Sequence, residues 1–185
     1  MNAYDFDGTI YRGDSTAHFC FYCMWRHPRA ALSLLSAIWA ALLYALGKLN
    51  KTAFKQRLFR FLAVLQDVDR DVERFWDKKQ RRIRRWYLDQ KRPDDAIASA
   101  SPEFLLTPIC RRLGVGLIGS RYDKRTGLCD GVNCDGVEKA RRFREEYPGV
   151  RPDEFYSDSL NDRPMAELAI NSYLVQGERI TPWPR

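Results

Sequence analysis

The chain has 185 residues, which suits one domain of ordinary size plus an insertion and is too short for separate catalytic and cofactor domains. It carries 31 Lys and Arg against 24 Asp and Glu, and the resulting charge of +7 favours anionic partners: phosphate esters, nucleic acid or anionic lipid. An odd number of cysteines, five, and a start without the pattern of a secretory leader favour a reducing cytoplasm.

The first expected element is a strand over residues 3–7, in the stretch AYDFDGTI. Side chains alternate along a strand, so Asp5 and Asp7 should project to one side and Phe6 to the other. Carboxylates held this close raise each other's pKa unless a cation or hydrogen-bond donors compensate, which indicates chemistry or a metal site. The alternative is an Asp-Gly surface turn with two solvated acids.

Residues 14–92 form a helical block by their apolar spacing. Within it, Ala30 to Gly47 is uncharged, and a stripe at helical spacing predicts a helix buried inside the block: Leu32, Leu35, Trp39, Leu42 and Leu46. A membrane-surface or re-entrant segment is the alternative. A true span is disfavoured, because one crossing would separate Asp5 from Ser99 and Asp158.

Residues 51–92 carry fourteen Lys and Arg against six acids, with aromatic residues interleaved. That mixture can form a nucleic-acid platform. The aromatics recur at helical intervals, however, which favours a solvated basic face over an apolar one, and no nucleic-acid partner is expected. The seven aromatics are Phe54, Phe59, Phe61, Phe75, Trp76, Trp86 and Tyr87.

From Asp94 onward, short apolar runs alternate with helical patterns, which predicts a parallel α/β sheet. Expected strands are AIASAS, VGLIGS, EFYSDS and SYLV, and expected helices cover residues 103–113, 137–147 and 162–169. In such sheets, ligands bind beyond the carboxyl ends of the strands.

The end of one expected strand and the start of one expected helix carry candidate phosphate-binding groups. Ser99, Ala100 and Ser101 offer hydroxyls and N–H groups to an anion, although Ser101 could equally be a helix N-cap before Pro102. Lys139 opens a helix, where the macrodipole disfavours a lysine and a phosphate would explain one.

The stretch FYSDSLNDRP places acidic residues just past a strand. Asp158 and Asp162 are four residues apart, so helical geometry would bring them together with Asn161 beside them. A loop acid followed by an ordinary capping Asp is the alternative.

Four motifs occur in order: DFDGT in the first strand, the serine after the second strand, Lys139 at the start of a helix, and SDSLND after the fourth strand. Together they resemble the four motifs of the haloacid dehalogenase-like superfamily. The stretches SASPEF and NCDGVEK are similar to its subfamily IB, the phosphoserine phosphatase-like group. The match covers residues 3–12 and about 94–175. The resemblance implies a Rossmann-like core (1–13 and 93–185), a helical cap (14–92), Mg²⁺ and a phosphoaspartate intermediate. The first strand is shorter than the resemblance would suggest.

Carried over residue by residue, the resemblance makes Asp5 the nucleophile and Asp7 the general acid and base. Asp5, the Asp7 carbonyl and Asp158 would hold Mg²⁺, and Asp162 would support them from behind. The phosphate-binding set would be Thr9, Ser99, Ala100, Ser101, Lys139 and Asn161.

The expected activity is therefore Mg²⁺-dependent hydrolysis of a small phosphorylated metabolite in the cytoplasm. The uncharged run and the basic block also resemble the bacterial phosphatidylglycerophosphatase branch. That alternative implies a lipid phosphate substrate and peripheral association with the inner face of an anionic membrane. A non-catalytic basic protein that binds RNA or membrane is the third hypothesis, and it must explain why all the candidate acids and Lys139 are present.

Overall fold

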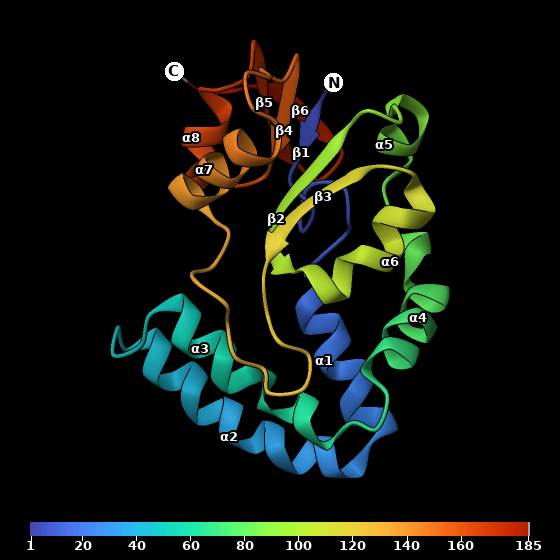
Figure 1. Ribbon diagram of the computed structural model, residues 1–185, viewed down its shortest axis with the longest axis vertical. Helices are drawn as coiled ribbons and strands as arrows, with labels where there is room; N and C mark the ends of the chain where they lie inside the picture. Colours follow the sequence, from blue (N-terminus) through green and yellow to red (C-terminus); the bar gives the residue numbers. More distant parts are fainter. Residues whose placement is uncertain (185) are drawn as a thin grey trace.

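The computed structural model describes residues 1–184; for residues 32–38 and 51–52 it describes the backbone only. Its centre is a six-stranded sheet with the order β3-β2-β1-β4-β5-β6 (Figure 1). The first five strands pair in parallel, and β6 pairs antiparallel with β5. The expected Rossmann-like α/β fold is confirmed. The strands are β1 (Ala3–Tyr4), β2 (Ala96–Pro102), β3 (Gly116–Ser120), β4 (Glu154–Ser157), β5 (Asn171–Gln176) and β6 (Arg179–Pro182).

Five α-helices and two 3-10 turns separate β1 from β2, and the remaining helices follow the later strands. The first group is α1 (Ser15–Arg26), α2 (Pro28–Ala45), α3 (Lys51–Leu58), η1 (Phe59–Val64), α4 (Val68–Lys79), η2 (Gln80–Arg82) and α5 (Arg85–Gln90). The second is α6 (Glu103–Leu113), α7 (Gly136–Glu146), η3 (Leu160–Asp162) and α8 (Arg163–Ala166).

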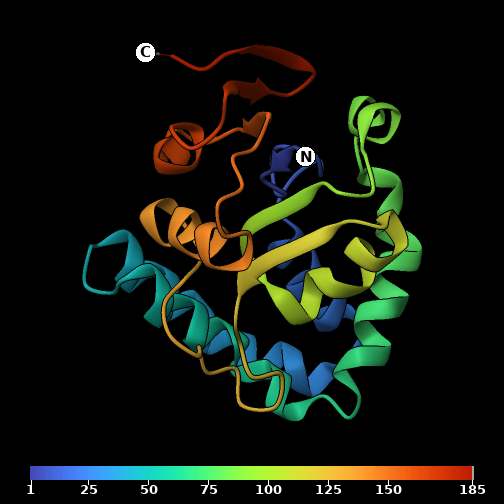
Figure 2. The same cartoon turned by 45° about the horizontal axis from the view of Figure 1, so that its top comes forward.

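The alternation of side chains divides the core into two parts, one on each face of the sheet. Tyr4 and Ile97 face the larger part, which includes side chains from α1, α4, α5 and α6. Ala3, Ala96 and Ala98 face the smaller part, beneath α7 and α8 (Figure 2). The small alanines let these two helices pack close to the sheet.

The first strand is shorter than expected, because it ends at Tyr4 and the chain then turns. The amides of Ile10 and Tyr11 both donate to the carbonyl of Phe6, which closes the turn. The Asp5 amide still donates to the Tyr156 carbonyl of β4, and Phe6 lies in the same part of the core as Tyr4, as alternation predicts. Asp7 lies within the turn, so the expected strand over residues 3–7 does not extend to it.

The uncharged helix α2 is not buried in the way its stripe predicts. Trp39, Leu42 and Leu46 are 63%, 48% and 59% exposed, whereas Ala40 is buried. Leu32 and Leu35 lie outside the described side chains. α2 contacts α1, α3 and η1 (Figure 1). The three stripe residues with described side chains lie at the surface instead of in these contacts. Within the described residues, no helix is long and apolar enough to cross a membrane.

Five of the seven aromatics of the basic block are core residues, as the helical spacing predicts, and Phe54 and Trp86 are partly buried. Phe59, Phe61, Phe75, Trp76 and Tyr87 are completely buried. The Trp76 indole donates a hydrogen bond of 2.6 Å to the Leu105 carbonyl in α6, so α4 and α6 share this part of the core.

The C-terminal region differs from the expectation in two ways. The predicted helix over residues 162–169 is only the short pair η3 and α8, ending at Ala166. The strand β6 was not predicted at all. It turns back through Gly177 to pair with β5 and forms the edge of the sheet.

Candidate active site

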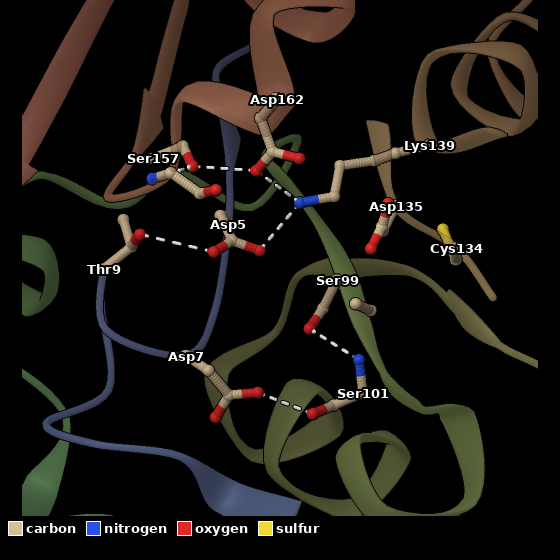
Figure 3. A network of polar contacts seen from close by, with 12 residues as sticks. Asp5, Asp7, Thr9, Ser99, Ser101, Cys134, Asp135, Lys139, Ser157 and Asp162 are labelled. Atoms are coloured by element: carbon tan, nitrogen blue, oxygen red, sulfur yellow. Dashed lines mark hydrogen bonds and ion pairs between the residues drawn. The ribbon is translucent and has the colours of Figure 1, made fainter. Parts of the chain in front are cut away.

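The candidate residues converge at the carboxyl ends of β1, β2 and β4, beside the first turn of α7. Figure 3 shows the side chains of Asp5, Asp7, Ser99 and Lys139 in one place, with Asp162 behind Lys139. This is the edge at which parallel sheets bind ligands.

Lys139 lies between two carboxylates. Its Nζ is 2.8 Å from Asp5 Oδ1 and 2.6 Å from Asp162 Oδ2, and the residue is 2% exposed. Burial by itself lowers the pKa of Lys139, but the charges of Asp5 and Asp162 outweigh it and hold the pKa above its usual value. The ammonium is therefore charged at neutral pH.

Asp5 is buried among groups of both signs. Burial raises the pKa of Asp5 to about 7; Lys139 opposes this, and the charges of Asp162 and Asp158 add to it. Its second oxygen, Oδ2, accepts a long hydrogen bond of 3.4 Å from Thr9. One carboxylate oxygen is thus fixed by Lys139, and the other is only weakly held.

Asp7 has a different environment. It accepts a hydrogen bond of 2.6 Å from the Ser15 amide and one of 2.5 Å from the Ser101 hydroxyl. Burial raises the pKa of Asp7 to about 6, with a further contribution from Asp14 and opposition from the two serines. A carboxyl group with this pKa exchanges a proton readily near neutral pH.

The segment Ser99–Ser101 ends β2 beside these acids. Ser99 Oγ accepts from the Ser101 amide at 3.1 Å, and Ser99 is 1% exposed. Ser101 is not a helix N-cap: α6 begins at Glu103 with Pro102 in the capping position, and the Ser101 hydroxyl points to Asp7. The alternative capping role for Ser101 is therefore wrong.

Thr9 connects Asp5 with Asp158. Its hydroxyl lies 3.3 Å from Asp158 Oδ1 and accepts a hydrogen bond of 2.9 Å from the Asp158 amide. Gly8 makes room for this arrangement: its φ is +75°, and a Cβ there would lie 2.0 Å from Asp158 Oδ2. A glycine is required for both reasons.

The remaining candidates lie in η3. Asp162 Oδ2 accepts from Lys139 and also from Ser157 Oγ at 2.7 Å. Asn161 is exposed, and its backbone N–H donates a hydrogen bond to Ser159 Oγ. The structure therefore brings Asp162 to Lys139 and gives the Asn161 side chain no such contact.

Sequence reasoning missed several polar partners of the site. Ser15 and Ser157 orient Asp7 and Asp162, and Thr16 Oγ1 lies 2.9 Å from Ser101 Oγ. Ser157 stands inside the acidic motif, where its position offered a signal. Ser15 and Thr16 had none, because they open α1 and stand outside all of the motifs.

The donor set fits a divalent cation. Lys139 pairs with Asp5 and Asp162, and Asp158 is connected to Asp5 through Thr9, so among these described residues the carboxylates outnumber the ammonium. The described residues contain no group of three or more His, Cys, Asp or Glu side chains arranged to hold a metal. The expected Mg²⁺ site does not need one, because it uses two carboxylates and a backbone carbonyl, and Mg²⁺ keeps several waters.

Comparison with known proteins identifies the family. The haloacid dehalogenase-like hydrolase family matches residues 3–167, and the chain belongs to it. Protein CicA of Caulobacter vibrioides is 32% identical over 188 aligned residues, which cover 90% of this chain and 82% of the relative. The protein is thus an enzyme of the hydrolase class.

Solved structures share the fold at lower identity. A protein of unknown function from Bordetella pertussis has a TM-score of 0.77 at 23% identity, over 93% of this chain and 87% of that one. A phosphoserine phosphohydrolase-like protein from Francisella tularensis has a TM-score of 0.56 at 14% identity, over 93% and 86%. A substrate-bound phosphoserine phosphatase has a TM-score of 0.51 at 16% identity, over 92% and 82%.

Proposed function

We propose that the protein is a Mg²⁺-dependent phosphatase that hydrolyses phosphate monoesters through a phosphoaspartate intermediate. The observation that carries the proposal is the difference between its two neighbouring acids. Asp5 is held by a charged lysine and has one weakly bound oxygen, whereas Asp7 is held by serine and amide donors and has a pKa near neutrality.

In the first step, Asp5 attacks phosphorus with the oxygen that Lys139 does not hold. A bond forms between Asp5 Oδ2 and phosphorus as the ester P–O bond breaks, and Asp7 gives its proton to the leaving alkoxide oxygen. In the second step, Asp7 takes a proton from water, which attacks the aspartyl phosphate. Asp5 and inorganic phosphate are released, and Asp7 is again protonated.

The phosphate oxygens would be held by groups at the ends of β2 and α7. The Ser99 hydroxyl, the backbone N–H of Ala100 and the Lys139 ammonium are donors suited to the charge that develops on the transferring group. Ser101 contributes indirectly, since its hydroxyl orients Asp7. In this arrangement, Thr9 orients Asp5 and Asp158.

Asp5, Asp158 and the Asp7 carbonyl would hold Mg²⁺. When bound, the ion supplies positive charge to these carboxylates and to the phosphate. The excess of carboxylates and the close approach of Asp158 to Gly8 support this assignment.

We infer that residues 14–92 form a cap and that residues 1–13 and 93–185 form the catalytic core. The helices α1 to α5 lie between β1 and β2, and Lys55 of α3 contacts the last residues of β2. Such a cap would select the substrate. The phosphoserine phosphatase fold of the structural relatives supports a small phosphorylated metabolite as the substrate. We infer that the enzyme acts in the cytoplasm.

A lipid phosphate is the second candidate substrate, and a specific observation favours it. Trp25 is 91% exposed in α1, Trp39 and Leu42 are exposed in α2, and Leu46 is exposed directly after α2. We define these four residues as the exposed apolar ridge. Basic residues Arg26, Arg29 and Lys48 flank it in the sequence, which suits an anionic membrane surface.

A substrate screen tests the proposal. The purified protein is incubated with Mg²⁺ and either soluble phosphomonoesters, including phosphoserine, or phosphatidylglycerol phosphate in vesicles. Release of phosphate that EDTA abolishes is expected. Absence of release from every substrate would overturn the proposed function and leave the non-catalytic binding hypothesis.

A further inference from the structure

Helix α3 reaches the candidate active site through one side chain, Lys55. Its Nζ donates a hydrogen bond of 2.7 Å to the carbonyl of Ala100, in the segment proposed to hold the phosphate. It donates a second, of 3.1 Å, to Asn133 Oδ1 in the loop that leads to α7. One ammonium therefore joins α3 to the end of β2 and to the loop before α7, both of which flank the site.

Ser120, at the end of β3, contacts the same two oxygen atoms. Its hydroxyl lies 2.9 Å from the Ala100 carbonyl and 3.2 Å from Asn133 Oδ1, and it accepts from the Cys134 amide at 2.8 Å. The Ala100 carbonyl is thus held by a neutral donor and by a charged one, and a charge-assisted hydrogen bond is roughly twice as strong as a neutral one.

These contacts fix the orientation of one peptide group. The Ala100–Ser101 peptide directs its carbonyl to Lys55 and Ser120 and its N–H to Ser99 Oγ. Because a peptide is planar, holding the carbonyl also fixes the N–H on its opposite side. The orientation of the Ser99 hydroxyl therefore depends on the donors to the Ala100 carbonyl.

The helical segment also packs against the loop between β3 and α7. The rings of Phe59 and Tyr122 lie 4.9 Å apart, and a Cβ on Gly127 would lie 2.6 Å from the Phe59 carbonyl. In Figures 1 and 2, this loop runs beside α3. Lys55 thus sits in a packed junction whose geometry is set from both sides.

We propose that Lys55 is a positioning residue, which orients the Ala100–Ser101 peptide and so assembles the anion-binding segment when α3 is seated against it. The inference rests on the proposed function for the role of that segment. Lys55 acts through the peptide, since it donates to the Ala100 carbonyl and to Asn133 Oδ1. Its charge also adds to the attraction for an anion at the site.

The test compares Lys55→Met with a matched control, Lys91→Met. Lys91 Nζ also donates 2.7 Å to a backbone carbonyl, that of Leu113, at the end of α6 remote from the phosphate segment. Each variant is assayed for p-nitrophenyl phosphate hydrolysis, for orthophosphate affinity by calorimetry in the presence of Mg²⁺, and for Tm. Lys55→Arg serves as the conservative variant.

Lys55→Met should weaken orthophosphate binding by about 10-fold or more and lower kcat/KM by about 10²-fold, the scale expected when a binding group is misplaced by about 1 Å. Lys55→Arg should recover most of both, and Lys91→Met should change neither. A lower Tm of Lys55→Met together with unchanged orthophosphate affinity would overturn the proposal, because Lys55 would then stabilise the fold without positioning the anion-binding segment.

The two proposals fail in different ways. If the unmodified protein binds orthophosphate but hydrolyses no phosphomonoester, the proposed function fails and the affinity comparison still decides the role of Lys55. If the unmodified protein is active and Lys55→Met matches it in affinity and kcat/KM, only the Lys55 proposal fails. If the unmodified protein binds no orthophosphate, the Lys55 proposal is overturned as well.

Discussion

Gly8 is the residue with the narrowest tolerance beside the site. Its positive φ strains any other residue by roughly 1–2 kcal/mol, and a Cβ there would collide with Asp158. Gly149 has nearly the same φ, +76°, but open space around its Cβ position. The two glycines therefore separate backbone strain from displacement of a carboxylate.

Gly8→Ala should lower Mg²⁺-dependent kcat/KM by about 10²-fold or more and shift the Mg²⁺ activation curve to higher concentration, because Asp158 must move. Gly149→Ala should lose only the backbone contribution to stability and keep its activity. Hydrolysis of p-nitrophenyl phosphate over a Mg²⁺ titration measures both. Wild-type Mg²⁺ dependence in Gly8→Ala would contradict the placement of Asp158 at the metal.

The sequence reveals the acids and Lys139 individually because their motifs are short and local. It does not reveal how they are connected. Asp5 and Asp7 meet different partners because the chain turns after Asp5. The partners of Asp7 are Ser15, at the start of α1, and Ser101, at the end of β2. Such contacts depend on the packing of α1 against β2, which no local pattern encodes.

At the scale of elements, α7 carries both Lys139 and the residues that hold the helix in place. Glu138 accepts from Arg141 and Arg142, and Arg142 also donates to the carbonyls of Gly119 and Val132. Hydrogen bonds from Arg141 and then Arg142 lower the pKa of Glu138 to about 2, although burial opposes them. The ionised form of Glu138 therefore stabilises the folded state.

Glu138→Gln should lower Tm at neutral pH. A carboxyl whose pKa is depressed on folding contributes fully above its unfolded pKa of 4.5 and progressively less as the pH falls toward 2. The difference in Tm from the unmodified protein should therefore shrink on acidification below about 4.5. Glu146→Gln, at an exposed position of the same helix, is the control. A difference independent of pH would show that ionisation of Glu138 is not the cause.

The exposed apolar ridge on α1 and α2 leads to a second prediction at this scale. The protein should co-sediment with anionic vesicles at low salt and less at high salt, since each near-surface Lys or Arg contributes roughly 1 kcal/mol that salt screens. Replacing Trp25 and Trp39 together with Ser should reduce binding, and Ile170→Ser, also an exposed apolar position, should not. Failure to bind at low salt would remove support for the lipid phosphate candidate.

Much of the element order could be predicted, because Gly and Pro positions and apolar periodicity mark β2, α6, β3 and α7 within a residue or two. The exposure of α2 could not. Its stripe at helical spacing predicts burial, but the helix packs through the face that carries Ala30 and Ala40. β6 was missed because its residues, RITP, have a mixed character that becomes a strand only by pairing with β5.

At the scale of the whole molecule, the sheet gathers groups from residues 5 to 162 into one site, and the helices inserted between β1 and β2 close on it through Lys55. In the proposed function, residues 1–13 and 93–185 would carry the chemistry and residues 14–92 would select the substrate. The chemistry depends on a division of roles between Asp5 and Asp7, which is the central claim.

Intact-mass analysis after a rapid acid quench tests that claim directly, with p-nitrophenyl phosphate as the substrate and Asp5→Asn and Asp7→Asn as the variants. The p-nitrophenolate leaving group needs little protonation, so Asp7→Asn should still form the aspartyl phosphate. Hydrolysis of that intermediate should be about 10²- to 10⁴-fold slower in Asp7→Asn, so the adduct should accumulate. Asp5→Asn should show neither adduct nor turnover, because the attacking carboxylate is gone. An adduct on Asp5→Asn, or unchanged turnover in either variant, would contradict the account.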